Sequence, residues 1–518
     1  MSLPQSSHSS CFENFITWLH HRSVSLHPSI SLHQFHSSNQ GNGLLATDHI
    51  PNNTILFSIP RLSFSKNSPL LTVNNSQLPS LLSQDQIIRC SKNWLLLVLV
   101  MMWERVRSKF QHTSLDNWGP YFQLMPENFD TLMFWSEDEL DELKGSTILN
   151  KIGKKEAEAD YENIIKPLIE TRPDIFPIPD GLTWDQCYGL SIYHIMGSLI
   201  LSRSFHVKFE NHPEGDTLVN NDLQPYQDFD NESLDDQNTK SEIESLDEDE
   251  KEDIKDIAMV PLADLLNAKS GCENAKLFYE LNVLNMTTTR DIKKGEQIYN
   301  TYGDPPNGDL LRRYGHVDDP NQFDLVEVSI TTCIESAAEF FEQQGPNHSI
   351  KQLENKVEWA LEMGLEEVFE LPTKLERERQ KLDLLPDDFI CALRILLSST
   401  EDFQSFKMKE KLPKPKLNEH VAQMAVFILQ RRLAEYPNSI EVDEQLLCNF
   451  NLPERKRKAI IVRRSEKRIL EDTRLSLIEK YSLNQLNSFN LNDNKKRKST
   501  TDVFDQLNNG NVKMKKIS

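Results

Sequence analysis

An acidic segment in the middle of the sequence limits the folds that the chain can adopt. From Glu210 to Asp256 the composition is dominated by Asp, Glu, Asn, Ser and Gln, and residues 245–253 are mostly acidic. Such a segment buries too little apolar surface to offset the conformational entropy lost on folding, which predicts a disordered loop. A domain with residues on both sides of this loop must therefore assemble from two separate parts of the sequence.

The overall composition favours a large globular protein with a basic partner. With 518 residues, the chain exceeds the usual size of one hydrophobic core, so we expect two to three domains. The formal net charge of −22 disfavours nucleic-acid binding, which relies on clustered Lys and Arg. It favours a basic partner, although the charge could also serve solubility alone. Residues 94–103, the most apolar run, are too short to span a bilayer, so we expect no membrane partner.

The cysteines indicate neither a metal site nor a disulfide framework. They occur singly, with no CxxC pair and no Cys/His cluster at zinc-binding spacing. We therefore expect no metal cofactor and a reducing compartment. The seven are Cys11, Cys90, Cys187, Cys272, Cys333, Cys391 and Cys448.

Apolar spacing and turn residues indicate mixed helices and strands before the acidic segment. Helical spacing predicts an amphipathic helix over residues 12–24 and mostly helical structure from 84 to 203. Residues 41–46 and 54–59 read as two strands joined by a turn at 51–53, which predicts a β-hairpin.

After the acidic segment the pattern changes from strands to helices. Residues 277–289 predict two strands around Asn282 and Val283. Among the basic residues of the last predicted helix, 456–458 and 463–464 are expected to form a solvated face. The helices expected in this part are 351–363, 387–397, 419–434 and 453–481.

Four short segments contain the residues that indicate a function. Each could also have a purely structural role: a glycine turn, a surface arginine, a helix-capping Asn, or half-buried tyrosines that donate structural hydrogen bonds. Their order along the chain is more specific than any one of them. They are Gly41–Gly43; Arg203–Phe205; Pro261–Asn267; and Asn300–Gly303 followed by Leu310–Gly315.

Together these segments resemble the SET domain, in the class typified by the Rubisco large-subunit lysine methyltransferase and the fungal ribosomal lysine methyltransferases. The resemblance covers residues 12–481 and implies an α+β fold: a β-rich SET domain with a pseudoknot, split by a helical insert, plus a C-terminal all-helical substrate-binding domain. The implied ranges are 12–83 and 258–318 for the two SET parts, 84–209 for the insert, 210–257 for the acidic loop, 319–481 for the substrate-binding domain and 482–518 for a flexible basic tail.

The same resemblance implies the cofactor S-adenosylmethionine and the residues that hold it. Most members of the class have His where this chain has Ala268, so backbone contacts to the cofactor would survive while any role of that imidazole is lost. The cofactor-binding residues implied are Gln40, Gly41, Asn42, Gly43, Arg203, Asn267, Ala268 and Tyr302.

The catalytic residues that the resemblance implies are Tyr302 and Tyr314, which would border a narrow lysine channel. The residues that it implies for substrate contact are Asp264, Tyr279 and Tyr314. A sulfonium is already a good methyl donor and needs only a neutral amine in line with it, so positioning dominates the chemistry. Desolvation in the channel and the sulfonium charge both lower the pKa of a lysine ammonium, whose ordinary value is about 10.4.

The resemblance and the charge together predict a protein-lysine methyltransferase that acts on a basic protein, namely a large-subunit ribosomal protein. A protein-histidine methyltransferase of the same fold and a catalytically silent binding module remain as alternatives. We expect a monomer, located in the nucleus or also in the cytoplasm, with importin recognising the basic run Lys495–Lys498.

The acidic loop can be tested by replacement. Exchanging residues 220–251 for a short Gly/Ser linker should leave the fold intact, because the entropy of loop closure changes slowly with length. The melting temperature measures this, and a large drop would show that the segment is structural.

Overall fold

The computed structural model describes residues 5–35, 41–61, 67–90, 94–110, 115–207, 257–269, 271–344 and 349–483. The chain forms two compact units: the first contains residues 1–327, 370–381 and 432–470, and the second contains 328–369, 382–431 and 471–518. These units divide the chain differently from the predicted ranges, because residues 432–470 group with the first unit. Nearly all of the predicted acidic loop and basic tail lie outside the described residues.

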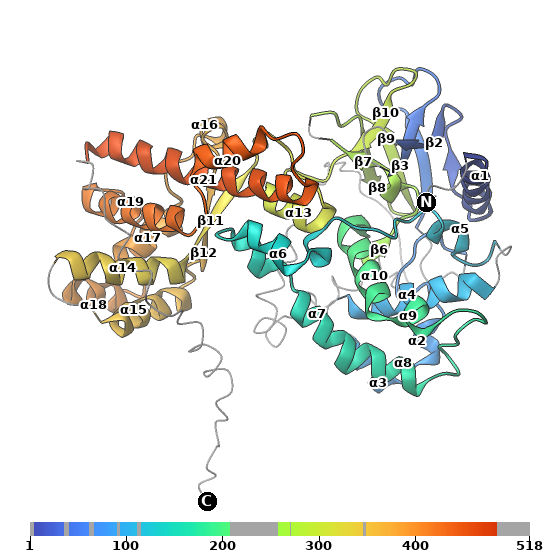
Figure 1. Ribbon diagram of the computed structural model, residues 1–518, viewed down its shortest axis with the longest axis horizontal. Helices are drawn as coiled ribbons and strands as arrows, with labels where there is room; N and C mark the ends of the chain where they lie inside the picture. Colours follow the sequence, from blue (N-terminus) through green and yellow to red (C-terminus); the bar gives the residue numbers. More distant parts are fainter. Residues whose placement is uncertain are drawn as a thin grey trace, which may run out of the picture. The chain divides into compact units, whose positions relative to one another are not determined.

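Two four-stranded sheets form the β-rich part of the first unit (Figure 1). One has the order β2-β3-β10-β7 and the other the order β1-β4-β9-β8. The strands of the first sheet are β2 (Ile30–Phe35), β3 (Gly41–Ala46), β7 (Asn267–Ala268) and β10 (Gln297–Asn300). Those of the second are β1 (Ser25–Leu26), β4 (Ile55–Pro60), β8 (Ala275–Tyr279) and β9 (Val283–Thr288).

The predicted hairpin between residues 41–46 and 54–59 is wrong, since β3 and β4 lie in different sheets. The residues between them pair with the end of β9 and the chain that follows it: the amide of Asn53 donates to the carbonyl of Thr288 over 3.1 Å, and Ile50 bridges Ile292. These partners lie more than 200 residues away in the sequence, so the local turn signal at 51–53 could not reveal them. The predicted strand pair within 277–289 is confirmed as β8 and β9.

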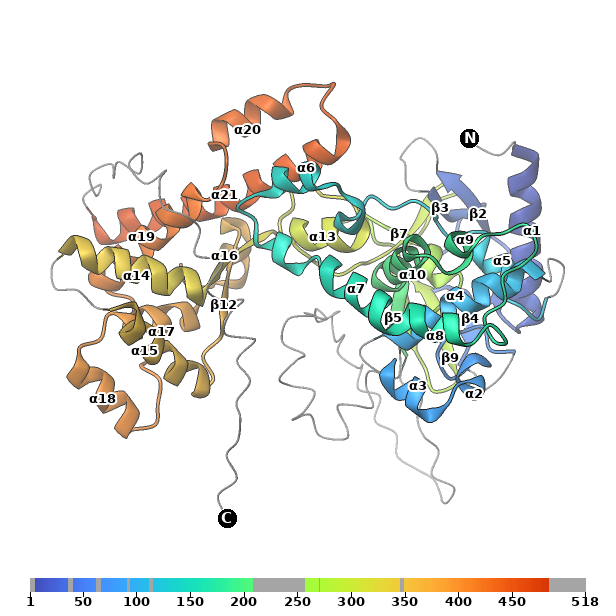
Figure 2. The same ribbon diagram turned by 60° about the horizontal axis from the view of Figure 1, so that its bottom comes forward.

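Helices cover the sheets of the first unit and share one hydrophobic core with them. Both views place α4 and α10 beside the strands (Figure 2). None of the described helices is long and apolar enough to cross a membrane. The larger helices are α1 (Gln5–His21), α4 (Leu95–Phe110) and α10 (Leu190–Arg203); shorter ones are α2 (Leu78–Leu81), α3 (Gln84–Arg89), α5 (Gly119–Phe122), α6 (Glu137–Leu140), α7 (Lys154–Asp160), α8 (Lys166–Thr171), α9 (Trp184–Tyr188), α13 (Asn307–Tyr314) and α16 (Lys374–Gln380).

A short strand pair closes the ends of the segment predicted as an acidic loop. β5 (Ser204–His206) runs antiparallel to β6 (Ile257–Met259), and His206 pairs with Ile257. The two sides of the insertion therefore meet as neighbours, as the replacement of the segment by a short linker requires.

The second unit is built mainly from helices, with α15 and α17 joined by a buried lysine. Lys356 of α15 donates from Nζ to the carbonyl of Leu396, the last residue of α17, over 3.3 Å and to that of Ser398 just beyond it over 2.7 Å. The C-terminal part of the chain is not wholly helical, because it also contains β11 (Leu325–Ser329) and β12 (Val368–Pro372). The helices of the second unit are α14 (Ile330–Gln344), α15 (Ile350–Glu362), α17 (Asp387–Leu396), α18 (Thr400–Met408) and most of α19 (Glu419–Ala434). α20 (Ile440–Leu447) and most of α21 (Glu454–Tyr481) lie in the first unit.

The basic residues of α21 do not form a solvated face, so that prediction is wrong. Arg463 is 1% exposed and donates to both carboxylate oxygens of Asp443, which is itself fully buried. Lys467 donates to the same carboxylate over 2.6 Å. Burial raises the pKa of Asp443, but these two cations outweigh it and hold that pKa below its ordinary value. Helical spacing reveals which residues share a face but not whether acidic partners cover that face.

Replacing Arg463 by Met should lower the free energy of unfolding by about 3 kcal/mol, because it removes one partner of a buried charge network. Arg468→Met is the matched control, since Arg468 pairs with Glu444 at the exposed surface and should cost less than about 1 kcal/mol. Urea denaturation measures both values. Equal losses for the two variants would contradict the assignment of a buried network.

Candidate active site

β10 brings the predicted motifs together. It pairs antiparallel with β3, where Ile298 lies opposite Leu44, and parallel with β7, where Tyr299 lies opposite Asn267. The chain between β10 and α13 therefore leaves the sheet beside the segment that carries Asn267. This parallel pairing of the two motif segments is what the pseudoknot expected from the sequence requires.

The glycine loop and Asn267 are in direct contact. The side-chain amide of Asn267 donates to the carbonyl of Asn42 over 3.2 Å, and Asn42 donates its own amide to the carbonyl of Leu124. A Cβ at Gly43 would lie 2.9 Å from Nδ2 of Asn267, so the close approach requires glycine there. Gly41, the first residue of β3, has a φ of +72°. Gln40 lies outside the described residues.

Arg203 reaches the same region from the last turn of α10. Its Nη1 donates to the backbone carbonyl of Asp264, and the carboxylate of Asp264 accepts a 2.6 Å hydrogen bond from the hydroxyl of Tyr121. Burial raises the pKa of Asp264 to about 7, opposed by Arg203 and Tyr121. Asp264 is buried and its carboxylate is bonded to Tyr121. This position suits a residue that supports Arg203 better than one that contacts the substrate, which was the role predicted for it.

The two predicted catalytic tyrosines stack on each other. Tyr302 follows β10, Tyr314 ends α13, and their ring centroids lie 4.2 Å apart with planes inclined by 8°. The hydroxyl of Tyr302 donates to the carbonyl of Leu266 over 3.4 Å. Burial raises the pKa of Tyr302, and raises that of Tyr314 to about 12, so both phenols stay protonated at neutral pH.

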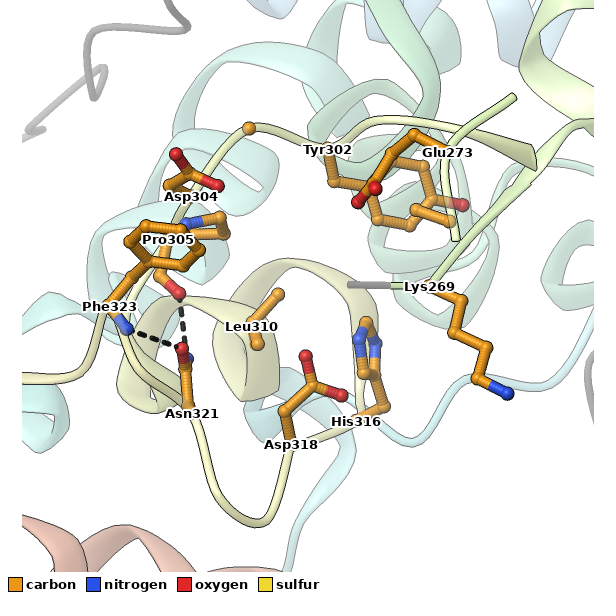
Figure 3. Close-up of a pocket in the computed structure, with 12 residues that line it drawn as sticks. Lys269, Glu273, Tyr302, Asp304, Pro305, Leu310, His316, Asp318, Asn321 and Phe323 are labelled. Atoms are coloured by element: carbon orange, nitrogen blue, oxygen red, sulfur yellow. Dashed lines mark hydrogen bonds between the residues drawn. The ribbon is translucent and has the colours of Figure 1, made fainter. Parts of the chain in front are cut away.

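A small pocket opens beside Tyr302. Figure 3 shows Tyr302 and Glu273 on one side and His316 and Asp318 on the other. Asn321 closes one end of the pocket by donating to the carbonyl of Pro305 over 3.0 Å. The described residues that line it are Ala268, Lys269, Glu273, Tyr302, Gly303, Asp304, Pro305, Leu310, His316, Asp318, Asn321 and Phe323.

The structure separates one predicted residue from this group and adds others. Tyr279 lies half exposed on β8 in the second sheet and is not among the described residues that line the pocket. Tyr121 and His316 were not predicted. His316 could have been found from the sequence, because it directly follows the Tyr314-Gly315 motif. Nothing in the local sequence around Tyr121 indicates its bond to Asp264.

Comparison with known proteins identifies the family. The SET domain model matches residues 41–303, and the model for the Rubisco LSMT substrate-binding domain matches residues 347–470. The chain belongs to the SET-domain family. The resemblance to the fungal and Rubisco enzymes is thereby confirmed, as is the fold class apart from the strands β11 and β12 in the C-terminal part.

Curated relatives share sequence over much of the chain. Ribosomal lysine N-methyltransferase 4 of Saccharomyces cerevisiae is 33% identical over 64% of this chain, a match that spans 60% of the yeast protein. N-lysine methyltransferase SETD6 of Homo sapiens is 25% identical over 83% of each chain. The Xenopus laevis protein setd6 is 26% identical over 88% of this chain and 93% of its own length.

Solved structures of Rubisco LSMT share the fold at 19% identity. One, bound to lysine and AdoHcy, superposes with a TM-score of 0.59 over 96% of this chain and 99% of that chain. Another, bound to sinefungin and monomethyllysine, gives 0.58 over the same shares of both chains.

Proposed function

We propose that this SET-domain protein transfers a methyl group from S-adenosylmethionine to a lysine of a ribosomal protein. That it is a protein-lysine methyltransferase rests on the SET domain and on relatives named as N-lysine methyltransferases. Within the molecule, the observation that supports the proposal is the stack of Tyr302 on Tyr314 beside the paired strands β7 and β10. This stack places two neutral phenols next to the motifs that the family resemblance assigns to the cofactor.

The residues present fit S-adenosylmethionine. Among the described residues, none accepts a hydrogen bond from the buried Nε of Arg203, which leaves a guanidinium donor for the carboxylate of an amino acid. The missing side chain at Gly43 lets the amide of Asn267 lie directly against the backbone of the glycine loop. Arg203, Asn267 and the backbone of residues 41–43 and 268 would hold the cofactor. When bound, it supplies an activated methyl group on a sulfonium centre.

The protein contributes position and desolvation to this reaction. The neutral hydroxyl of Tyr302 can accept a hydrogen bond from the substrate amine while it donates to the carbonyl of Leu266, so it can orient the nitrogen lone pair. Burial around the two tyrosines disfavours the ammonium form of a lysine, and solvent takes up the proton that the lysine releases. Tyr314 fixes the plane of the Tyr302 ring through the stack.

The charge of the chain supports a basic substrate. Residues 210–256 contain 18 acidic and 3 basic residues, which is −15 of the formal net charge of −22. Ribosomal proteins are rich in Lys and Arg, so this field would steer them toward the enzyme. The yeast relative named as a ribosomal lysine methyltransferase suggests the same substrate class. Nuclear location stays a prediction that rests on Lys495–Lys498, which lie outside the described residues.

Tyr302→Phe should lower kcat by about 100-fold while the dissociation constant for S-adenosylhomocysteine stays within about twofold. The variant keeps the stacked ring and loses only the hydroxyl that orients the amine. Methyl transfer and calorimetric binding are measured separately. Tyr481→Phe, which removes a hydroxyl in the second unit, is the control and should change neither value. Wild-type turnover in Tyr302→Phe would remove this residue from the catalytic assignment.

The substrate class is tested by offering free ribosomal proteins, intact ribosomal subunits and histones with labelled cofactor. We expect free large-subunit ribosomal proteins to be labelled on lysine most efficiently, because assembly buries their extended segments in RNA. Raising the salt concentration should slow labelling, since it screens the electrostatic attraction. Labelling confined to histones, or found on histidine, would exclude the proposal.

A further inference from the structure

The basic helix α21 contacts the end of α13 that carries Tyr314. Lys458 donates from Nζ to the carbonyl of Gly315 over 2.8 Å, and it also pairs with the carboxylate of Asp130. The side chain of Lys458 is 13% exposed. A lysine ammonium at this position lies at the C-terminus of α13, where the helix dipole favours positive charge.

Gly315 is held on two sides. Its φ of +74° ends α13 in the left-handed conformation, and a Cβ there would lie 2.8 Å from the carbonyl carbon of Asp130. Asp130 is itself fixed by Arg455, whose Nε donates to it over 2.7 Å. The backbone of Asp130 therefore lies against Gly315, while Lys458 joins the carboxylate of Asp130 to the carbonyl of Gly315.

The same helices also share apolar contacts. Leu311 of α13 packs in one buried cluster with Ala459 and Val462 of α21. These residues and Lys458 lie in the first compact unit, so the contact belongs to one body. The last turn of α13 thus has both an apolar and an ionic attachment to α21.

We propose that Lys458 is a positioning residue for methyl transfer: through the carbonyl of Gly315 it holds Tyr314 in its stack on Tyr302. Tyr314 immediately precedes Gly315, so a shift of that carbonyl moves the tyrosine ring. Lys458 touches neither tyrosine ring and acts through the backbone. This inference rests on the proposed methyltransferase activity. It adds that α21, a helix outside the SET motifs, helps to position Tyr314.

The charge of Lys458 also acts on His316, the next residue after Gly315. Burial lowers the pKa of His316, the nearby Asp318 raises it, and Lys458 lowers it. The other charged groups that line the same pocket are Lys269, Glu273 and Asp304. Because Ala268 and Tyr302 line this pocket too, a protonated His316 would face the cationic cofactor and weaken its binding.

Lys458→Met tests the positioning role, with Lys456→Met as the matched control. Lys456 lies on the same helix and pairs with Glu142 away from α13. We expect Lys458→Met to lower kcat about tenfold with little change in KM for S-adenosylmethionine at pH 8, because a small displacement of positioned groups slows the chemistry. Lys456→Met should keep kcat within twofold of wild type. Equal kcat losses in the two variants, or none in Lys458→Met, would overturn the proposal.

The pH dependence of cofactor binding gives a readout that loss of stability would not produce. Without the Lys458 charge, the pKa of His316 rises, so calorimetric affinity for S-adenosylmethionine should begin to fall at a higher pH than in wild type. Lys458→Arg keeps the charge and should restore both the wild-type midpoint and most of kcat. An unshifted midpoint in Lys458→Met, or no rescue by Arg, would contradict the inference. Absence of methyl transfer by wild type would instead count against the proposed function.

Discussion

The site depends on the pairing of β10 with two strands that come from opposite sides of the acidic segment. Asn274, which is fully buried, secures this pairing: its amide donates to the carbonyl of Gln297 over 2.9 Å, and its side-chain oxygen accepts from the amide of Tyr299 over 2.8 Å. An unpaired buried backbone group would cost about 1–3 kcal/mol. Asn274 therefore fixes β10 in the register that places Asn267 beside the chain leading to Tyr302.

The motif residues could be proposed because the family resemblance that implies their roles rests on short, local segments. A glycine pair, an arginine, and tyrosines followed by glycine are visible in short segments. The structure brings Asn42 against Asn267, and Tyr302 against the carbonyl of the residue before Asn267. The contacts that hold them are not local. Tyr121 bonds Asp264 across 143 residues, and no pattern near either residue indicates the other.

Two of the wrong predictions, the hairpin and the basic face of α21, have the same physical origin. The hairpin was inferred from adjacent strands and a turn, but the residues near Ile50 find their partners near Ile292. The basic face of α21 was inferred from helical spacing, but Arg463 and Lys458 find acidic and carbonyl partners in segments between residues 130 and 315. The spacing of apolar and charged residues shows which side chains share one face of a helix or strand. Whether that face is buried depends on which distant segments pack against it.

The internal pairing of these cations determines which charges of the protein would face the proposed basic substrate. Arg455, Lys458 and Arg463 are each paired with carboxylates of the first unit, so these ion pairs contribute little to the field beyond the protein surface. Most of the negative charge instead belongs to residues 210–256, which enter and leave the fold at β5 and β6. β5 begins directly after Arg203, and β6 precedes the segment that carries Asp264 and Asn267. The sequence thus connects its most acidic part to the two segments that frame the candidate cofactor site, where attraction of a basic protein would be most effective.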